Sequence, residues 1–374
     1  MFNRRNIFKA LALGTISLPV LLRSMLGESK AQAPNDTSIA RSGPVLEWKM
    51  TTTWPPNFPV LDEACKLYAR LVEQLSGGRV KIKVFAGGEL APPLKAFETV
   101  QRGAAEVGCG AGYYWAGTAP AAQFFASIPF GLNSSQHTAW VVSGGGMELW
   151  RELYAQFNLV PFLGGSTGVQ MGGWFNREIN SMADIQGLKM RIPGIGGSVF
   201  SKAGGSQVLM PGSELYTSLE RGVIDATEWL GPYHDTLMGF HEIADYYYTP
   251  GWHEPGTALE FFVNKEKYDQ LSPDLQGIFE AASAQVHLWC WMEMEKRNAE
   301  ALQTLVEEGI QLRQFPTEVL DEFRRLTAIA LAELSAKDAF SRRVYDSLRD
   351  FQTKAVRYAA ITEKRFYNDL QRES

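Results

Sequence analysis

Strand-like and helix-like segments alternate along this chain, and that alternation limits the fold more than any other feature of the sequence. In one segment Val80, Ile82 and Val84 share a face, as in a half-buried strand. Segments that alternate in this way build a sheet whose strands are joined by crossover helices. In chain order we predict a strand at 46–52, a helix at 60–75, a strand at 79–85, a helix at 94–102 and a strand at 105–111.

A second series of strands begins near residue 159. Leu188, Met190 and Ile192 occupy one face of an alternating segment, and the basic residues between them occupy the other. Two α/β units joined by several chain crossings predict a cleft between two lobes, which is the usual place for a ligand. The predicted elements are strands at 159–162, 169–175, 188–192, 224–228 and 258–264, with a helix at 213–221.

The C-terminal part of the chain has a helical pattern throughout. Ser272 precedes Pro273 and Asp274, an order typical of a helix start because Pro fits the first turn and an acid complements the helix dipole. The pattern continues to Gly309, which is too long for one ordinary helix, so we expect a break or a long hinge helix. Further helices are expected at 317–337 and 338–371.

The first 33 residues have the layout of a targeting segment. Arg4 and Arg5 precede an apolar run of 13 residues, and Ala31 and Ala33 are small residues suited to a cleavage site. The run is too short to span the roughly 30 Å of a bilayer core, and paired arginines are typical of the twin-arginine export signal. We therefore predict a signal peptide at 1–33 and export to the periplasm by the twin-arginine route.

The charge of the remaining chain argues against nucleic acid as a partner. The chain has a formal net charge of −5, and residues 1–33 carry five basic residues and one acidic residue, so the remainder carries −9. An acidic protein without a basic stripe is not expected to bind nucleic acid. Cys65, Cys109 and Cys290 allow one disulfide at most, and the sequence leaves open whether two of them pair or all three fill the core.

Enzyme motifs are absent or lack their structural context. The chain has no HExxH, no GxxxxGK[ST] and no GxGxxG within a βαβ unit. Residues 164–168 match GxSxG, but a nucleophilic serine there needs a helix directly after it, and a strand-like segment follows instead. The five histidines show no metal-ligand spacing. They are His137, His234, His241, His253 and His287. We therefore expect a binding protein rather than an enzyme.

Two glutamates have aromatic and small apolar neighbours in the sequence. An isolated carboxylate at Glu228 or Glu254 would be costly unless it is paired or binds a cation. Together with the amide oxygen of Gln170 and nearby backbone carbonyls, they would form an oxygen-rich site for Na⁺ or Ca²⁺. Arg191 offers a rigid guanidinium that can hold one carboxylate through two hydrogen bonds. The spacing leaves open whether Arg191 binds a ligand or pairs with one of the two glutamates.

Seven short blocks form an ordered pattern along the chain. They are Phe85–Leu90, Gly112–Trp115, Pro129–Leu132, Gly168–Phe175, Gly187–Arg191, Ile224–Trp229 and Tyr246–Glu254. In this order they resemble the substrate-binding subunits of tripartite ATP-independent periplasmic (TRAP) transporters, in the DctP-like family. The resemblance is closest to the branch that binds 2-oxo acids such as pyruvate, and it covers essentially the whole chain after the predicted signal peptide.

The resemblance implies a role for individual residues in ligand binding. Arg191 would hold the ligand carboxylate, and Tyr113 or Tyr114 would hydrogen-bond the ligand from the facing lobe. The ring of Trp229 would form an apolar wall, unless it belongs only to the core. Gln170 would contact both the ligand and a cation.

The resemblance also implies a bridging cation. Gln170, Glu228, Glu254 and the backbone carbonyl of Trp229 would bind Na⁺ or Ca²⁺, and the same ion would hold the carboxylate and 2-oxo oxygens of the ligand. The expected function is therefore a receptor that binds a small 2-oxo monocarboxylate for secondary uptake.

The fold and the partners follow from the same resemblance. It implies an α/β protein of the type II periplasmic-binding-protein fold, with two lobes around a cleft and long C-terminal helices. Lobe I is expected at 45–165 with about 258–312, and lobe II at 166–257 with about 313–337. The helix at 338–374 would support a homodimer. The small and large membrane subunits of a TRAP transporter are the expected partners.

Three residues depart from the family pattern and leave the choice of acid open. His253 stands where a second tryptophan is expected, His234 where an acid is usual, and Asn176 where arginine is frequent. The alternatives are a receptor for a 2-hydroxy acid such as lactate, a secreted metal-dependent enzyme acting on such acids, or a receptor that reports ligand to a sensor.

Overall fold

The computed structural model describes residues 44–371 of the chain. The predicted signal peptide at 1–33 lies outside the described residues. No helix within 44–371 is long and apolar enough to cross a membrane.

The first sheet holds the strands nearest the N-terminus and one that returns later in the chain. Its order is β2 (Val80–Phe85), β1 (Leu46–Thr52), β3 (Val107–Gly110), β10 (Ala258–Asn264) and β4 (Leu159–Ser166). The first three run parallel, with α2 (Leu61–Leu75) and α3 (Ala96–Gln101) between them in the chain, which confirms the predicted β-α-β-α-β order. β10 runs antiparallel between β3 and β4, and each of its residues is buried.

The second sheet is built mostly from the middle of the chain. Its order is β11 (Gln311–Gln314), β9 (Tyr246–Thr249), β5 (Gly173–Phe175), β8 (Ala226–Thr227), β6 (Lys189–Arg191) and β7 (Ser206–Val208). The helices α6 (Gly194–Lys202), α7 (Leu215–Glu220) and α8 (Pro232–Leu237) lie between these strands in the chain. The chain therefore leaves the first sheet after β4, returns to it for β10, and rejoins the second sheet at β11.

Several strands differ from their predicted length, and β4 and β5 differ most. β4 continues to Ser166, beyond the predicted end at 162, so no helix follows this serine and the GxSxG match is not a nucleophile turn. β5 begins only at Gly173, because the residues before it bond to separate segments. The amide of Gln170 donates to the Glu254 carbonyl at 3.3 Å, and that of Gly172 donates to Tyr248 at 2.6 Å.

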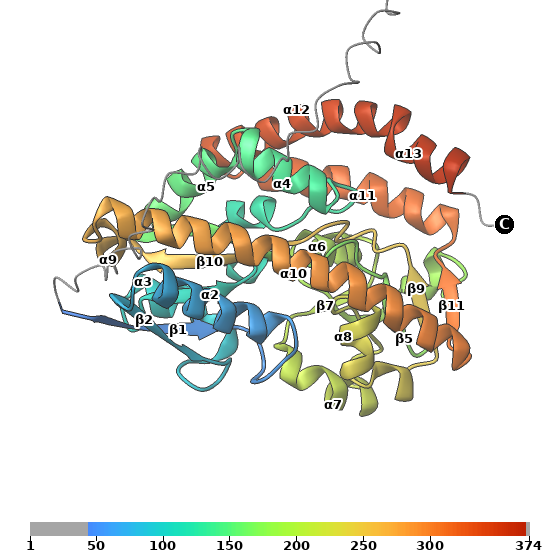
Figure 1. Ribbon diagram of the computed structural model, residues 1–374. Coiled ribbons are helices and arrows are strands. Elements are labelled where there is room, and N and C mark those ends of the chain that lie inside the picture. The colour runs from blue at the N-terminus through green and yellow to red at the C-terminus, as the bar shows by residue number, and fades with distance from the viewer. Residues whose placement is uncertain (1–43, 372–374) are drawn as a thin grey trace, which may run out of the picture. The chain divides into compact units, whose positions relative to one another are not determined.

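One long helix contacts elements that belong to the first sheet and elements that belong to the second. α10 (Pro273–Glu307) is a single helix of 35 residues, so the expected break is absent and the long helix is present. No proline follows Pro273 within it, so nothing in the sequence interrupts its hydrogen bonds. α10 packs against α2 and β4, and against α8 further along, and Figure 1 shows it running the length of the molecule.

The C-terminal helices form an outer layer. α11 (Thr317–Ser335) packs on α6, and α12 (Ala339–Ile361) packs on α11, α4 (Ser134–Ser143) and α5 (Gly146–Ala155), as Figure 1 shows. The Asp338 carboxylate caps α12 by accepting from the Ser341 amide at 2.7 Å. The predicted helix at 338–371 is divided into α12, α13 (Glu363–Arg365) and a turn of π-helix at Phe366–Leu370. The short α9 (Lys265–Asp269) follows β10.

The three cysteines all lie in the core and are unpaired. Burial is the main cause that raises the pKa of Cys290 to about 12, and it also raises the pKa of Cys65. The Trp54 indole lies 3.3 Å from the Cys109 sulfur. Of the two possibilities that the sequence left open, the cysteines are apolar core residues.

Candidate functional site

The predicted site residues come from strand ends and from the segments that connect the sheets. Arg191 is the last residue of β6, and Glu228 and Trp229 follow β8. Because β6 and β8 are neighbouring parallel strands, their carboxyl ends place Arg191 beside Glu228. Gln170 follows β4, and Glu254 lies between β9 and β10, so both belong to segments that cross between the sheets.

Arg191 is buried and surrounded by polar partners. Its Nη1 bonds to the Glu228 carboxylate, and also donates to the Glu228 carbonyl at 3.3 Å. Its Nε donates to the Met210 carbonyl at 3.4 Å, its Nη2 donates to the Tyr114 hydroxyl at 3.3 Å, and its guanidinium lies 5.1 Å from the Trp229 ring. Burial is the largest single effect and opposes the charged form, but the Glu228 carboxylate together with Tyr114 and Tyr113 outweighs it and raises the pKa of Arg191. Arg191 therefore makes the pairing with a glutamate that the sequence had left open.

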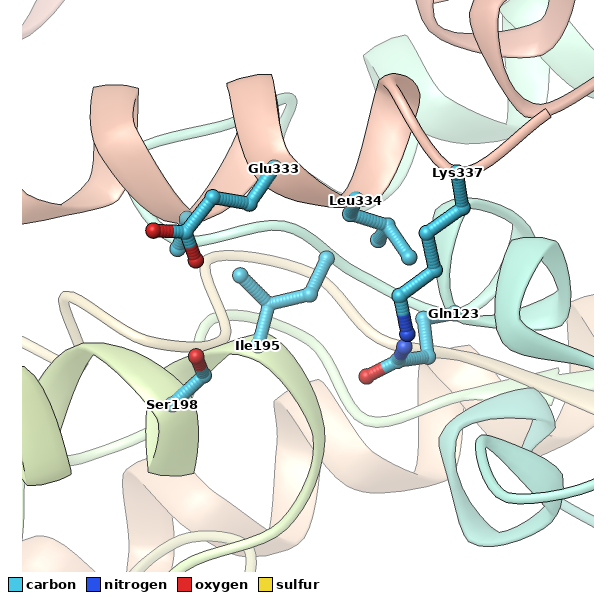
Figure 2. Close-up of a pocket in the computed structure, with 7 residues that line it drawn as sticks. Gln123, Ile195, Ser198, Glu333, Leu334 and Lys337 are labelled. Atoms are coloured by element: carbon cyan, nitrogen blue, oxygen red, sulfur yellow. The ribbon is translucent and has the colours of Figure 1, made fainter. Parts of the chain in front are cut away.

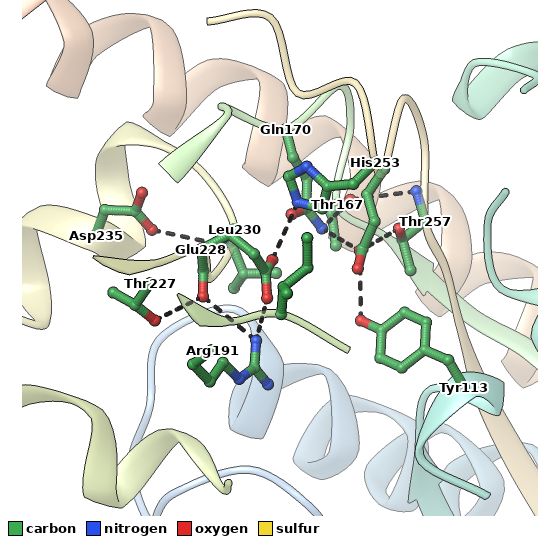
Figure 3. A network of polar contacts seen from close by, with 12 residues as sticks. Tyr113, Thr167, Gln170, Arg191, Thr227, Glu228, Leu230, Asp235, His253 and Thr257 are labelled. Atoms are coloured by element: carbon green, nitrogen blue, oxygen red, sulfur yellow. Dashed lines mark hydrogen bonds and ion pairs between the residues drawn. The ribbon is translucent and has the colours of Figure 1, made fainter. Parts of the chain in front are cut away.

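A cluster of buried ionisable groups lies next to Arg191. Glu228, His253 and Glu254 offer atoms within 4.8 Å of one another, and each side chain is almost completely buried. His253 Nε2 lies 3.3 Å from Glu228 Oε2. The Oε2 atom of Glu254 accepts from Gln170 Nε2 at 2.7 Å and from the Thr257 hydroxyl at 2.5 Å, as Figure 3 shows for this network.

The electrostatics of this cluster leave negative charge to be neutralised. Burial, and then the charge of Glu228, raises the pKa of Glu254 to about 7. Glu228 pairs with the Arg191 guanidinium, whereas Glu254 accepts from the uncharged groups of Gln170, Thr257 and Tyr113. Like charges in a buried site destabilise each other unless a positive group lies between them. The cluster can therefore hold a proton or a cation.

Two tyrosines reach this cluster from the first sheet. Tyr113 and Tyr114 lie in the 3-10 turn Gly112–Trp115 that follows β3. The Tyr113 hydroxyl donates to Glu254 Oε2 at 3.4 Å, while the Tyr114 hydroxyl accepts from Arg191. Burial, and then Glu254, raises the pKa of Tyr113 well above its usual value, so this hydroxyl stays neutral and remains a donor.

One buried oxygen in the cluster has no hydrogen-bond partner, and it shows whether the residues present suit a cation. Gln170 is 2% exposed, and no group within residues 44–371 donates to its Oε1. A buried polar atom left in this way costs about 1–3 kcal/mol. Amide and carboxylate oxygens are the ligands that Na⁺ and Ca²⁺ take, so the residues present fit such a cation.

Sequence reasoning did not assign His253 to the cation cluster. The sequence singled it out as a departure from an expected tryptophan and as the one candidate base for the enzyme alternative, but not as a cation ligand. Its main partner Glu228 is 25 positions away in the chain. Its position next to Glu254 was the one available signal. Its Nδ1 has no partner within the part of the chain that the structure describes, so His253 adds a nitrogen donor to the predicted oxygen set.

The other two departures lie outside the cluster. The His234 ring nitrogen lies 2.9 Å from the Pro59 carbonyl, and burial lowers the pKa of His234 to about 4. Asn176 is exposed on the surface, and its amide donates to the Asp225 carbonyl at 3.1 Å. Of the three departures, only His253 contacts the predicted ligand residues.

A separate pocket of about 180 Å³ lies between α6, α11 and the 3-10 helix Pro120–Phe125. Figure 2 shows Ser198, Glu333 and Lys337 around it. Glu333 pairs with Lys202 at 2.7 Å, and none of the predicted ligand residues lines this pocket. It lacks the guanidinium and the cluster of oxygens that the buried site offers, so the buried site is the better candidate for an acid and a cation.

Comparison with known proteins identifies a family and a close relative. Residues 50–338 match the DctP model, described as bacterial extracellular solute-binding protein, family 7. A monocarboxylate 2-oxoacid-binding periplasmic protein from Nostoc is 39% identical over 334 residues, which cover 89% of this chain and 92% of the relative.

Two solved structures share the fold over most of their length. A TRAP periplasmic solute-binding protein from Pseudoalteromonas atlantica, with bound sodium and pyruvate, is 40% identical with a TM-score of 0.85, covering 87% of this chain and 99% of its own. A TRAP transporter solute-binding protein from Bordetella bronchiseptica, a mixed-occupancy dimer with copurified calcium and picolinate, is 36% identical with a TM-score of 0.85, covering 87% and 97%. These similarities confirm the predicted fold class.

Proposed function

This chain belongs to family 7 of the bacterial extracellular solute-binding proteins, and from that membership we propose what it binds and how. It is a solute-binding receptor of the TRAP transporter class. We propose that its ligand is a small 2-oxo monocarboxylate such as pyruvate. Arg191 would hold the carboxylate, and Na⁺ or Ca²⁺ bound nearby would bridge the protein and the ligand.

The observation that carries the proposal is the partnerless Gln170 oxygen beside two buried carboxylates and a buried guanidinium. A purely structural ion pair needs one carboxylate for one arginine, and this cluster has a second carboxylate and an unused amide oxygen. Relatives described as binding 2-oxo acids or holding pyruvate with sodium share 39–40% of the sequence, which supports the same ligand class here.

Arg191 would exchange partners when the ligand binds. Its guanidinium pairs with Glu228, and a ligand carboxylate offers the same two-oxygen fork. Transfer of Arg191 to the ligand would free the Glu228 oxygens for the cation, while Tyr114 keeps the guanidinium oriented through its hydroxyl. Tyr113, which points at Glu254, is placed to donate to a ligand oxygen.

Gln170, Glu228, Glu254 and the Trp229 carbonyl are the residues that would hold the cation, and His253 is a further candidate. A bound cation supplies the positive charge that attracts both carboxylates and the chelating oxygens of a 2-oxo acid. Burial of these residues excludes water and strengthens each of these interactions.

Calorimetric titration of pyruvate into the wild type and Arg191→Ala tests the proposal. We expect the variant to lose most of the affinity, by 100-fold or more, because removing a buried charged partner costs about 3–5 kcal/mol. Titration with L-lactate then distinguishes a 2-oxo from a 2-hydroxy ligand. Repeating the pyruvate titration with a chelator, and in Na⁺-free buffer, distinguishes Ca²⁺ from Na⁺.

Arg297→Ala is the matched control for Arg191→Ala. Arg297 also contacts an acid and a tyrosine, Glu293 and Tyr233, but it lies on α10 outside the cluster. The control should bind pyruvate like the wild type. Equal affinities of Arg191→Ala and the wild type would remove Arg191 from the site. If neither the chelator nor the absence of Na⁺ changes the affinity for pyruvate, the protein does not use a bridging cation.

An enzyme acting on such acids is a second candidate, favoured by one observation. His253 lies beside Glu228 within the cluster, where an imidazole can act as a base. Incubation of the protein with pyruvate and Ca²⁺, followed by product analysis, separates the two functions. Product formed on a turnover timescale would establish catalysis and contradict a role in binding alone.

We also propose that the chain is exported to the periplasm by the twin-arginine route, on the basis of the paired arginines at Arg4 and Arg5. Proteins of this family are extracytoplasmic. Replacing both arginines by lysine should leave the uncleaved protein in the cytoplasm of a bacterial host. Normal export of that variant would contradict the route.

A homodimer is the last part of the proposal, and exposed apolar residues near the C-terminus support it. Tyr358, Ile361, Tyr367 and Leu370 are 63–77% exposed, on α12 and the turn that follows α13. Exposed apolar side chains concentrated on one segment are typical of a surface that meets a partner. The Bordetella relative described as a dimer supports a second copy as that partner, beside the transporter's membrane subunits.

A further inference from the structure

Asp235 is a buried carboxylate that the predicted site does not include. It lies on α8 and is 1% exposed. Its Oδ1 accepts from the Leu230 amide at 3.2 Å, and its Oδ2 accepts from the Tyr247 hydroxyl at 2.9 Å and from the Trp174 indole at 3.3 Å. Figure 3 shows Asp235 and its bond toward Leu230 beside the Arg191–Glu228 pair. No arginine or lysine pairs with it in the described part of the chain.

The Leu230 amide belongs to the same peptide group as the Trp229 carbonyl. A peptide group is planar, and in the trans form its N–H and C=O point in opposite directions. The only cis peptide among the described residues is Thr249–Pro250, so this group is trans. A hydrogen bond that fixes the direction of the Leu230 N–H therefore also fixes the direction of the Trp229 oxygen.

In its ionised form, Asp235 has a second effect on the same peptide group. A carboxylate that accepts from an N–H polarises the peptide, which increases the negative charge on its carbonyl oxygen. A more negative carbonyl oxygen is a better ligand for a hard cation.

The peptide after Leu230 joins this arrangement to another ligand segment. The Leu230 carbonyl accepts from the Met171 amide at 3.4 Å, and Met171 follows Gln170. The Gln170 amide in turn donates to the Glu254 carbonyl at 3.3 Å. The segments that carry Trp229, Gln170 and Glu254 are therefore linked through their backbones, and Asp235 holds one end of that link.

We propose that Asp235 is a positioning residue of the cation site, which orients and polarises the Trp229 carbonyl through the Leu230 amide. This inference rests on the proposed function, since it requires that a cation binds there. Asp235 would not contact the ion itself, but it would raise the affinity of the site for that ion.

Asp235→Asn tests the inference with little change in side-chain volume. One carboxylate oxygen becomes an NH₂ group, so the acceptor is lost either for the Leu230 amide or for both the Tyr247 hydroxyl and the Trp174 indole. We expect the cation concentration at half-saturation to rise about 10–100-fold, as is usual when a group supporting a metal ligand is removed. The readout is tryptophan fluorescence of chelator-treated protein titrated with CaCl₂ and, separately, with NaCl. Thermal unfolding of the same protein without cation measures stability independently.

Glu260→Gln is the matched control. Glu260 is likewise buried and accepts from one tryptophan and one tyrosine, Trp115 at 2.5 Å and Tyr154 at 2.7 Å, but it lies on β10. It has no bond to a segment carrying a predicted cation ligand. We expect this variant to change the unfolding temperature without changing the cation titration. An equal loss of cation affinity in both variants, or none in Asp235→Asn, would overturn the positioning role.

The cation titration of the wild type and that of Tyr247→Phe distinguish a failure of the proposed function from a failure of this inference. If the wild type shows no dependence on Ca²⁺ or Na⁺, the proposed cation site itself is wrong. If the wild type depends on a cation and Asp235→Asn matches it, only the role of Asp235 is wrong. If Asp235→Asn does not fold, Tyr247→Phe removes a single donor from Oδ2, and a several-fold weaker cation titration is expected. An unchanged titration in Tyr247→Phe would then count against the inference.

Discussion

Glu254, Asp235 and Glu260 are three buried carboxyl groups whose pKa values are all raised to about 7, mainly by burial. Their neighbours differ. Glu254 lies against Glu228 and an amide. Asp235 and Glu260 each accept from an indole and a phenol, and Asp235 accepts from a backbone N–H as well. Glu260 accepts from Trp115, which follows Tyr114 in the turn Gly112–Trp115, but it makes no hydrogen bond to a predicted cation ligand. We therefore expect its ionisation to change stability rather than cation binding.

Glu260 makes stability depend on pH in a defined direction. Its pKa rises from the ordinary 4.5 to about 7 on folding, so the folded state holds the proton more tightly. The stability that this gives is complete below pH 4.5 and is lost as the pH rises through 7. We expect the wild type to lose up to about 3 kcal/mol relative to Glu260→Gln between pH 4.5 and 8.

Urea unfolding of both proteins at pH 4.5, 6 and 8 measures this difference. The comparison cancels the other titrating groups, because they are common to the two proteins. A difference in unfolding free energy that stays constant over this range would show that Glu260 has an ordinary pKa.

Sequence reasoning reached the site residues by two different routes. Arg191 and Glu228 were accessible from strand pattern and chemistry, since strands that are neighbours in a parallel sheet bring their carboxyl ends together. Gln170 was proposed from its chemistry, as an amide oxygen beside the two glutamates. Tyr113 came only from the resemblance, because its partner Glu254 is 141 positions away in the chain. Asp235 was missed, since a single acid at a helix start reads as an ordinary first-turn residue.

At the scale of elements, periodicity predicted the long segments and failed at the short ones. β10 was predicted at its observed bounds, because a run of buried residues leaves a clear pattern. β5 and β8 are much shorter than predicted. The residues next to them include the site residues Gln170 and Glu228, whose backbones bond outside the ladder: the Gln170 amide donates to the Glu254 carbonyl and the Glu228 amide to the Arg191 carbonyl.

Gly251 shows how closely two of these segments pack. A Cβ at this position would lie 2.1 Å from the Gln170 carbonyl oxygen, so one backbone would have to move. We expect Gly251→Ala to lower the unfolding free energy by about 1–3 kcal/mol. It should also weaken pyruvate binding about 10-fold or more, because the moved segment carries Gln170. Thermal unfolding and calorimetry measure the two effects.

Gly277→Ala is the control and should have the opposite sign. A Cβ there meets nothing within 4 Å, and the residue lies in α10, where alanine is favoured over glycine by about 1 kcal/mol. The control should be more stable than the wild type and bind pyruvate equally well. Normal binding by Gly251→Ala would show that the Gln170 segment tolerates displacement.

At the scale of the whole molecule, the site joins groups from both sheets and is closed to solvent. Tyr113 and Tyr114 follow a strand of the first sheet, and they bond to Glu254 and Arg191. A ligand can reach these buried groups only if the contacts between them open. The lobe ranges predicted from the sequence remain predictions, and β11 at Gln311–Gln314 crosses the predicted boundary at 312.

The proposed dimer gives a prediction at the same scale. Ile361→Asp combined with Leu370→Asp places two charges on the exposed apolar segment. We expect the mass measured by light scattering to fall from that of two chains to that of one, with unchanged pyruvate affinity. Val223→Asp, at a site that is 55% exposed between α7 and β8, is the control and should leave the mass unchanged. A monomeric wild type would rule the dimer out.

The three buried thiols can be used to measure how often the folded protein opens. A thiol reacts with an alkylating reagent as the thiolate, and burial keeps Cys65 and Cys290 protonated while the core is closed. Their modification should therefore proceed at the rate at which the core opens, whatever the concentration of a fast reagent. The fraction labelled during a short pulse would then count how many molecules had unfolded in that interval, in a cell extract as well as in a purified sample.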